Sequence, residues 1–525
     1  MGDHRARRRR RVGGAVLGAV ATGLHGLSLW QPWRRASIYK GNRRRQPLVF
    51  GPIGQIADSI TRSAQGVADT VATPFVDPVI RLGVTGLSRA GKTVFITSLV
   101  ANLLDRARMP QLVAEAEGRI LAAYLQPQPD DTMPRFDYEA NLGMLSAATP
   151  RWPDNTRAVS QLRLSLKLRP KGLLAGIGGD RKVHIDIVDY PGEWLLDLGL
   201  MGKSYEDWSL ESLGRLAQRP GGAQYLDMAR ATNASERFAE PGAKALAASF
   251  TQALHAARDA GFSDCTPGRF LLPGEKEGSP ALTFAPLPPL GDAPRQSLWR
   301  EMQRRYEAYK RQIVGPFFRD HFSRIDRQVV LVDALGAIHA GPAAVEDLRR
   351  TMAEILSAFR PGGNAFLRQL LLGKRVEKIL FAATKADHLH HTQHPRLTAI
   401  MEALTREARD RARFAGAQTG AMSIAALRAT VEQTLPHQGR DLDCVRGTLM
   451  NEDGTRGRAA AFHPGMLPED PTRLLGPARD GAPAWLDGDY AIMKFAPAPL
   501  TLKPGEGPPH IRLDRAAQFL LGDRL

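Results

Sequence analysis

The chain has 525 residues, of which 43% are hydrophobic and 24% charged, as is usual for a globular protein of about two to four domain-sized units. Its two cysteines, Cys265 and Cys444, lie far apart, which indicates neither a disulfide scaffold nor a zinc site and suits a reducing cytosol. The net charge is +17, but residues 1–50 hold twelve basic residues and one acid, leaving a balance of only +6 elsewhere. Nucleic-acid binding is therefore not expected.

The first 50 residues form a basic N-terminal extension around a weakly apolar stretch at residues 12–30. A membrane span or an uncleaved signal is one interpretation of that stretch. We favour a disordered extension, or an upstream start codon chosen in error, because glycine, alanine and threonine dominate the stretch and basic residues flank it equally.

Residues 51–80 are predicted to contain an amphipathic helix, since apolar residues recur at three- and four-residue spacing over residues 53–72. We expect its apolar face to pack on the domain that follows. Docking on a membrane surface is the alternative.

Short, almost wholly apolar strands then alternate with helical patterns. This alternation predicts an α/β fold of the P-loop NTPase class, with a mostly parallel sheet covered on both faces. The expected strands are residues 79–85, 182–190, 327–335, 376–387 and, last, 417–425.

The second and third of these strands are separated by far more residues than one crossover needs, and most of that stretch has a helical pattern. We therefore divide the chain into a first part of the nucleotide-binding domain (81–194), a helical insertion (195–325), and a second part with a C-terminal extension (326–525). The last residues, from His510, predict a closing helix.

The first strand leads into a phosphate-binding loop that matches G-x-x-x-x-G-K-[ST] and opens a helix. Glycines let the backbone turn its N–H groups inward around an anion, the lysine reaches the β- and γ-phosphates, and the threonine hydroxyl binds Mg²⁺. The loop residues are Gly86, Leu87, Ser88, Arg89, Ala90, Gly91, Lys92 and Thr93.

The second strand ends in the D-x-x-G sequence Asp189-Tyr190-Pro191-Gly192. An aspartate at that edge can hold the Mg²⁺ shell, and the Gly192 N–H can sense a γ-phosphate and move the following loop. A strand-ending Pro-Gly turn is the simpler alternative. Asp333, after the third strand, is a rival for the Mg²⁺ carboxylate, although no D-x-x-G follows it.

The fourth strand ends in Thr384-Lys385-Ala386-Asp387, close to the N-K-x-D of GTPases. An aspartate there accepts hydrogen bonds from guanine N1 and N2, which adenine cannot donate, and the lysine stem covers the base. Threonine replaces the usual asparagine. Ser423 and Ile424 begin a stretch where a further base-contacting loop is expected.

Hydrolysis requires a positioned water molecule, and Glu193 stands directly after the D-x-x-G, where Ras-like GTPases place a glutamine. Glu193 can orient that water or simply support the next helix, and we leave both readings open. With Lys92 it is the candidate catalytic pair. Thr156 is the candidate switch threonine for Mg²⁺, with an ordinary cap as its alternative.

Four histidines follow Asp387, at positions 388, 390, 391 and 394. Their spacing includes no partner carboxylate or cysteine, so the sequence predicts a solvated loop rather than a metal site.

At residues 83–104 the chain resembles the bacterial YcjX-like family of P-loop proteins. Further matching stretches are DIVDYPGEWLLDL, ATKADH, SIAALRAT and PHIRLDRAAQFLLGD, and together they reach from about residue 80 to the end. The resemblance implies a Ras-like G-domain with a helical insertion and a guanine nucleotide at the P-loop. It also implies a role in bacterial envelope stress beside an inner-membrane protein.

The motifs and the resemblance together predict a protein that binds GTP or GDP with Mg²⁺ and hydrolyses GTP slowly as a switch. We expect it in the cytoplasm or peripherally at the inner membrane, and a homodimer is left open. An ATPase that remodels a partner protein is one alternative. A membrane-surface scaffold in which the nucleotide is only structural is the other.

Overall fold

The computed structural model describes residues 77–87, 89–154, 158–171, 179–357, 376–414, 416–451, 453–485 and 490–525. The predicted N-terminal extension (1–50) and nearly all of the predicted amphipathic helix (51–80) lie outside these ranges. So do Ser88 and Thr156. Residues 75–525 form one compact unit.

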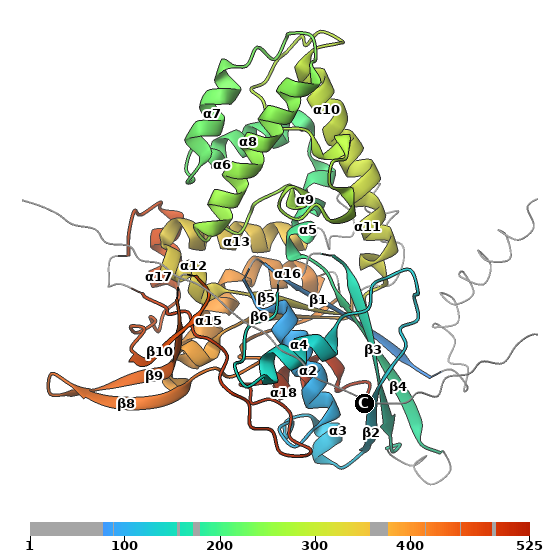
Figure 1. Ribbon diagram of the computed structural model, residues 1–525, viewed down its shortest axis with the longest axis vertical. Helices are drawn as coiled ribbons and strands as arrows, with labels where there is room; N and C mark the ends of the chain where they lie inside the picture. Colours follow the sequence, from blue (N-terminus) through green and yellow to red (C-terminus); the bar gives the residue numbers. More distant parts are fainter. Residues whose placement is uncertain are drawn as a thin grey trace, which may run out of the picture. The chain divides into compact units, whose positions relative to one another are not determined.

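The centre of this unit is a seven-stranded sheet with the strand order β2-β3-β4-β1-β5-β6-β7 (Figure 1). Strands β4, β1, β5, β6 and β7 are parallel, whereas β2 and β3 join one edge in antiparallel pairs. The predicted α/β fold with a mostly parallel sheet is therefore confirmed. The strands are β1 (Val79–Gly86), β2 (Ile120–Gln126), β3 (Ser160–Leu168), β4 (Arg181–Asp189), β5 (Arg327–Val332), β6 (Lys378–Ala383) and β7 (Gln418–Ser423).

Both faces of the sheet are buried, which explains why its central strands are nearly continuous apolar runs. In β5, Val329 and Leu331 join one hydrophobic cluster, while Val330 and Val332 join the other. This alternation follows from the two-residue period of a strand.

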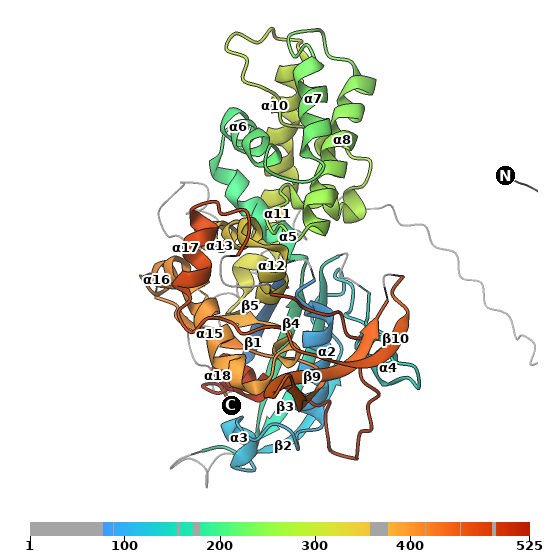
Figure 2. The same ribbon diagram turned by 90° about the vertical axis from the view of Figure 1, so that its left-hand side faces the viewer.

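Each face has its own set of helices (Figure 2). One cluster contains α2 (Lys92–Leu104) and α18 (Leu513–Leu521), with the short α3 (Val113–Ala116) and α4 (Tyr138–Ser146) at its margin. The other contains α12 (Ala334–Ala340), α13 (Pro342–Ser357), α15 (His394–Leu404), α16 (Arg406–Phe414) and α17 (Thr472–Arg479).

Between β4 and β5 the described elements are all helices, joined by loops, and α6, α7, α8 and α10 extend beyond the sheet (Figures 1 and 2). An aromatic core holds them together, in which Trp208 stacks on Tyr306 with 5.0 Å between ring centroids. The helices are α5 (Gly192–Leu196), α6 (Tyr205–Leu216), α7 (Gly222–Ala231), α8 (Glu240–Asp259), α9 (Gly268–Leu271), α10 (Leu298–Tyr309) and α11 (Gly315–Asp320).

A second, antiparallel sheet follows the first, with the order β10-β9-β8. Its strands are β8 (Val431–His437), β9 (Arg440–Met450) and β10 (Arg456–Phe462). These strands were not predicted from the sequence, because they contain no long apolar run and most of their residues are only half-buried or exposed. Within the described ranges, we find no helix whose length and apolar character would let it cross a bilayer.

Candidate functional site

The phosphate-binding loop connects the end of β1 to the start of α2, as its sequence requires. Gly91 has a φ of 78°, in the left-handed region that favours glycine, and this turn delivers Lys92 and Thr93 into the first turn of α2. The Lys92 Nζ donates to the Gly86 carbonyl oxygen at 3.4 Å. The Thr93 hydroxyl donates to the carbonyl oxygen of Asp154 at 3.3 Å.

The D-x-x-G turn lies directly against this loop. Asp189, at the end of β4, is opposite Val84 of β1 in the parallel register and is 2% exposed. Gly192 packs so tightly that a Cβ atom there would lie 2.1 Å from the Gly86 carbonyl oxygen. Only glycine fits this contact, so the backbone of the D-x-x-G and the backbone of the P-loop are in direct contact.

The Thr384–Asp387 segment follows β6, two strands from β1. Lys385 has a φ of 61°, and its Nζ forms a short ion pair with Asp333 Oδ2 at the end of β5. Asp387 is 5% exposed, and its Oδ2 accepts a hydrogen bond from the Ala429 N–H at 2.8 Å. Among the described residues the other carboxylate oxygen, Oδ1, has no hydrogen bond.

One cavity of about 700 Å³ joins these two motifs, a volume within the range of nucleotide-sized ligand sites. It opens along the carboxyl ends of the parallel strands, where ligands of open α/β sheets bind. Its lining includes P-loop residues 89–93, Asp333, Thr384, Lys385, Asp387, residues 425–427, the end of α8, and residues 492–495.

Some predicted site residues lie elsewhere. Ser423 and Ile424 are fully buried, and the cavity is lined instead by the next three residues, 425–427. Glu193 is 7% exposed, in the first turn of α5, and does not line the cavity. Its Oε2 has no hydrogen-bond partner among the residues that the structure describes. Base contacts by Ser423 and Ile424, and the catalytic role of Glu193, stay predictions.

The predicted solvated histidine loop is wrong for three of its four members. His388, His390 and His394 are at most 9% exposed, because the C-terminal segments pack over them. His388 lines the cavity and meets the edge of Phe495, with 5.1 Å between ring centroids. Burial lowers the pKa of His388, although the charge of Asp387 opposes this.

Three groups of cavity residues were not among the predicted site residues. Asp154 precedes the predicted switch threonine, Thr156, by two positions, and that threonine lies outside the described residues. Asp259 closes α8 and pairs with Arg89 of the P-loop at 3.1 Å, and Phe495 belongs to the C-terminal extension. Asp259 and Phe495 are not part of any sequence motif, because each reaches the cavity only through tertiary packing.

The phosphate end can hold Mg²⁺. The ion takes hard oxygen ligands, and Thr93 Oγ1 lies at the cavity within hydrogen-bond distance of the Asp154 carbonyl oxygen. The Asp189 carboxylate ends the adjacent strand. The Thr93 hydroxyl and the Asp189 carboxylate are oxygen donors of the kind that Mg²⁺ takes, and of the two only Thr93 lines the cavity.

Comparisons with known proteins show what the chain is similar to. The model of the YcjX-like family, DUF463, matches residues 80–525. The Ras-like GTPase YcjX of Escherichia coli is 35% identical over 465 residues, covering 86% of this chain and 97% of the relative. The Ras-like GTPase YcjX of Shewanella oneidensis is 35% identical over 492 residues, covering 89% and 98%.

Proposed function

The chain belongs to the YcjX-like family, and we propose that it binds GTP and hydrolyses it slowly, as a molecular switch. The observation that carries the proposal is the single cavity lined by both the P-loop and the Thr384–Asp387 segment. A nucleotide whose phosphates bind at the P-loop would place its base at the other end of this cavity, beside Thr384–Asp387. The names of the two relatives support the same activity.

Base selection is assigned to Asp387. Its Oδ2 is occupied by the Ala429 N–H, which fixes the carboxylate plane and leaves Oδ1 to accept from the base. Guanine offers N1–H and N2–H donors, whereas adenine offers no such pair on the corresponding edge. The Lys385 stem covers the base, and its ammonium is held by Asp333.

The triphosphate is assigned to the P-loop. Inward backbone N–H groups and the N-terminus of α2 attract its charge, and Lys92 turns from the Gly86 carbonyl to the β- and γ-phosphates. Thr93, Asp189 and the switch threonine predicted at Thr156 would hold Mg²⁺, and the bound ion would neutralise charge on the same oxygens.

We expect hydrolysis to be slow because of Glu193, the residue after the D-x-x-G. Glu193 replaces the glutamine that orients water in Ras-like proteins, and its carboxylate is buried outside the cavity lining. It must move before it can touch a water molecule at the γ-phosphate. We therefore expect Lys92 to bind and polarise the phosphates, with Glu193 acting only in a rearranged state.

Three successive residues offer a route from nucleotide to the helices between β4 and β5. Gly192 touches the P-loop, the backbone of Glu193 packs on Gly268, and the Arg269 guanidinium lies over the Trp194 ring at 3.2 Å. A γ-phosphate that pulls Gly192 would displace α5 and, with it, α9. The proposed helical insertion, residues 195–325, is the part that would report the nucleotide state.

Family membership also supports a finer proposal, in which the protein acts in envelope stress beside an inner-membrane protein. It would then work in the cytoplasm or peripherally at the inner membrane, as a monomer or homodimer. Flotation with anionic vesicles, with and without residues 1–80, tests the membrane part. Equal recovery of both forms at the bottom of the gradient would count against it.

The deciding experiment is calorimetry with Mg²⁺ and GTP, GDP, XDP, ATP and ADP, on the wild type and Asp387→Asn. In the variant the amide oxygen keeps the hydrogen bond from Ala429 and the NH₂ group faces the base. The affinity for guanine nucleotides should therefore fall about 100-fold, and the affinity for xanthine nucleotides should rise, because xanthine has an oxygen at C2. Lys92→Ala should weaken binding of every nucleotide. If adenine nucleotides bind as tightly as guanine nucleotides, and Asp387→Asn does not change their affinity, the proposal is wrong and an ATPase becomes the preferred function.

A further inference from the structure

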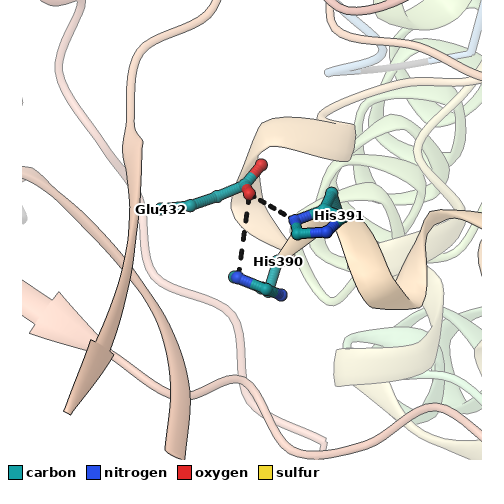
Figure 3. Close-up of side chains that lie close together, drawn as sticks. All are labelled: His390, His391 and Glu432. Carbon is teal, nitrogen blue, oxygen red and sulfur yellow. Dashed lines mark hydrogen bonds and ion pairs between the residues drawn. The ribbon is translucent and has the colours of Figure 1, made fainter.

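A second cluster of polar side chains consists of His390, His391 and Glu432 (Figure 3). It begins two residues after His388, which lines the cavity. His390 and His391 come from the loop between β6 and α15, and Glu432 comes from β8, outside the seven-stranded sheet. One ligand atom from each lies within 4.8 Å of the other two. The carboxylate that the sequence spacing lacked is supplied by a strand about 40 residues away.

The three ligand atoms lie close together. His391 Nδ1 lies 2.6 Å and His390 Nε2 lies 3.7 Å from the same oxygen, Glu432 Oε2. Tetrahedral zinc, with bonds of about 2.0–2.2 Å, sets its ligand atoms about 3.3–3.5 Å apart. The hydrogen bond between His391 and Glu432 is shorter than that spacing, so an ion would replace it, and the His391 side chain that must move is 64% exposed.

A further carboxylate completes the arrangement. His390 Nδ1 is hydrogen-bonded to the Thr392 hydroxyl oxygen at 3.0 Å, and that hydroxyl donates to Asp443 Oδ2 of β9 at 3.2 Å. The same Asp443 oxygen also lies 3.2 Å from His390 Nδ1. A histidine that binds a metal through one nitrogen commonly donates its other N–H to a carboxylate, which fixes the tautomer. His390 is thus oriented with Nε2 toward Glu432.

We propose that His390 Nε2, His391 Nδ1 and Glu432 Oε2 bind a zinc-class divalent ion, with water as the fourth ligand. Imidazole with one carboxylate selects zinc over magnesium. The ion would fasten the loop after β6 to β8. The same loop carries Asp387, and Thr430, two residues before Glu432, donates to the Asp387 carbonyl oxygen.

The test titrates Zn²⁺ into the chelator-treated full chain, purified without a polyhistidine tag, by calorimetry at neutral pH. We expect one ion per chain with a Kd of about 10 µM or tighter. His391→Ala with Glu432→Gln should weaken this binding at least about 100-fold, and Asp443→Asn about 10- to 100-fold. His437→Ala, an exposed histidine at the end of β8, is the matched control and should bind as the wild type.

A spectroscopic measurement on the wild type guards against variants that fail to fold. Co²⁺ should give the intense visible absorption of a four-coordinate ion, and Zn²⁺ should abolish it. The proposal is overturned if the wild type binds Zn²⁺ no more tightly than about 1 mM. It is also overturned if the double variant keeps the wild-type affinity, which would leave the cluster a hydrogen-bonded contact.

Discussion

The two ends of the proposed nucleotide cavity, the phosphate end and the base end, are built in different ways. The phosphate end is one short loop, residues 86–93, whose glycine turn and helix start are adjacent in sequence. The base end combines the segment after β6, the segment before β8 and residues 492–495, which lie far apart in sequence. Backbone shape forms the first end, and side-chain hydrogen bonds between distant segments form the second.

This difference predicts how each end fails. A substitution at the phosphate end should act through steric conflict with the backbone and affect every phosphate ligand. At the base end, substitution should remove a hydrogen bond, change the affinity for guanine nucleotides, and leave inorganic tripolyphosphate with Mg²⁺ bound as before.

The largest effect is expected for Gly192→Ala. The new Cβ would meet the Gly86 carbonyl at 2.1 Å, so the P-loop or α5 must shift, lowering the free energy of unfolding by about 3 kcal/mol. Urea denaturation measures this, and tripolyphosphate affinity should fall as well. Gly214→Ala is the control, since nothing lies within 4 Å of its Cβ and alanine favours α6. Equal stability of the two variants would contradict the contact.

A smaller effect is expected for Thr430→Val at the base end. The buried Thr430 hydroxyl donates to the Asp387 carbonyl oxygen. Its loss should weaken the binding free energy of GDP by about 1–2 kcal/mol and leave the affinity for tripolyphosphate unchanged. Calorimetry separates the two ligands. Thr434→Val, at an exposed position of β8, serves as the control. Equal losses for both ligands would mean that the two ends are not independent.

Because His388 is buried at the base end, we expect the stability of the protein to depend on pH. Burial lowers its pKa from 6.5, so below pH 6.5 the unfolded chain binds more protons than the folded chain, and stability falls as the pH falls. Between pH 7.5 and 5.5 the free energy of unfolding should fall by up to about 1.4 kcal/mol for this reason. His388→Phe, which keeps an aromatic ring against Phe495, should remove that part of the pH dependence of urea unfolding. An unchanged dependence would contradict the assignment.

The smallest effect is expected for the ion pair between Arg89 and Asp259. The two side chains are 49% and 59% exposed, so a double-mutant cycle should give a coupling below about 1 kcal/mol. Unfolding of Arg89→Ala, Asp259→Ala and the double variant measures it. A coupling of several kcal/mol would show that α8 is fastened to the P-loop through this pair.

Local sequence determined much of the molecule. The five parallel strands and the helices α2 and α18 follow from apolar runs and periodicity, and the elements predicted there agree with them. The P-loop geometry is likewise local, because glycine conformation and a helix start are encoded within eight residues.

Tertiary structure decided what the local pattern does not contain. The antiparallel strands β2 and β8–β10 were not predicted, since strand identity there depends on pairing partners rather than on apolar runs. Only folding brings Ala429 to Asp387, Asp259 to Arg89, and Glu432 to His391. The sequence could name the nucleotide motifs because each is contiguous, whereas contacts between distant segments depend on the packing of the whole unit.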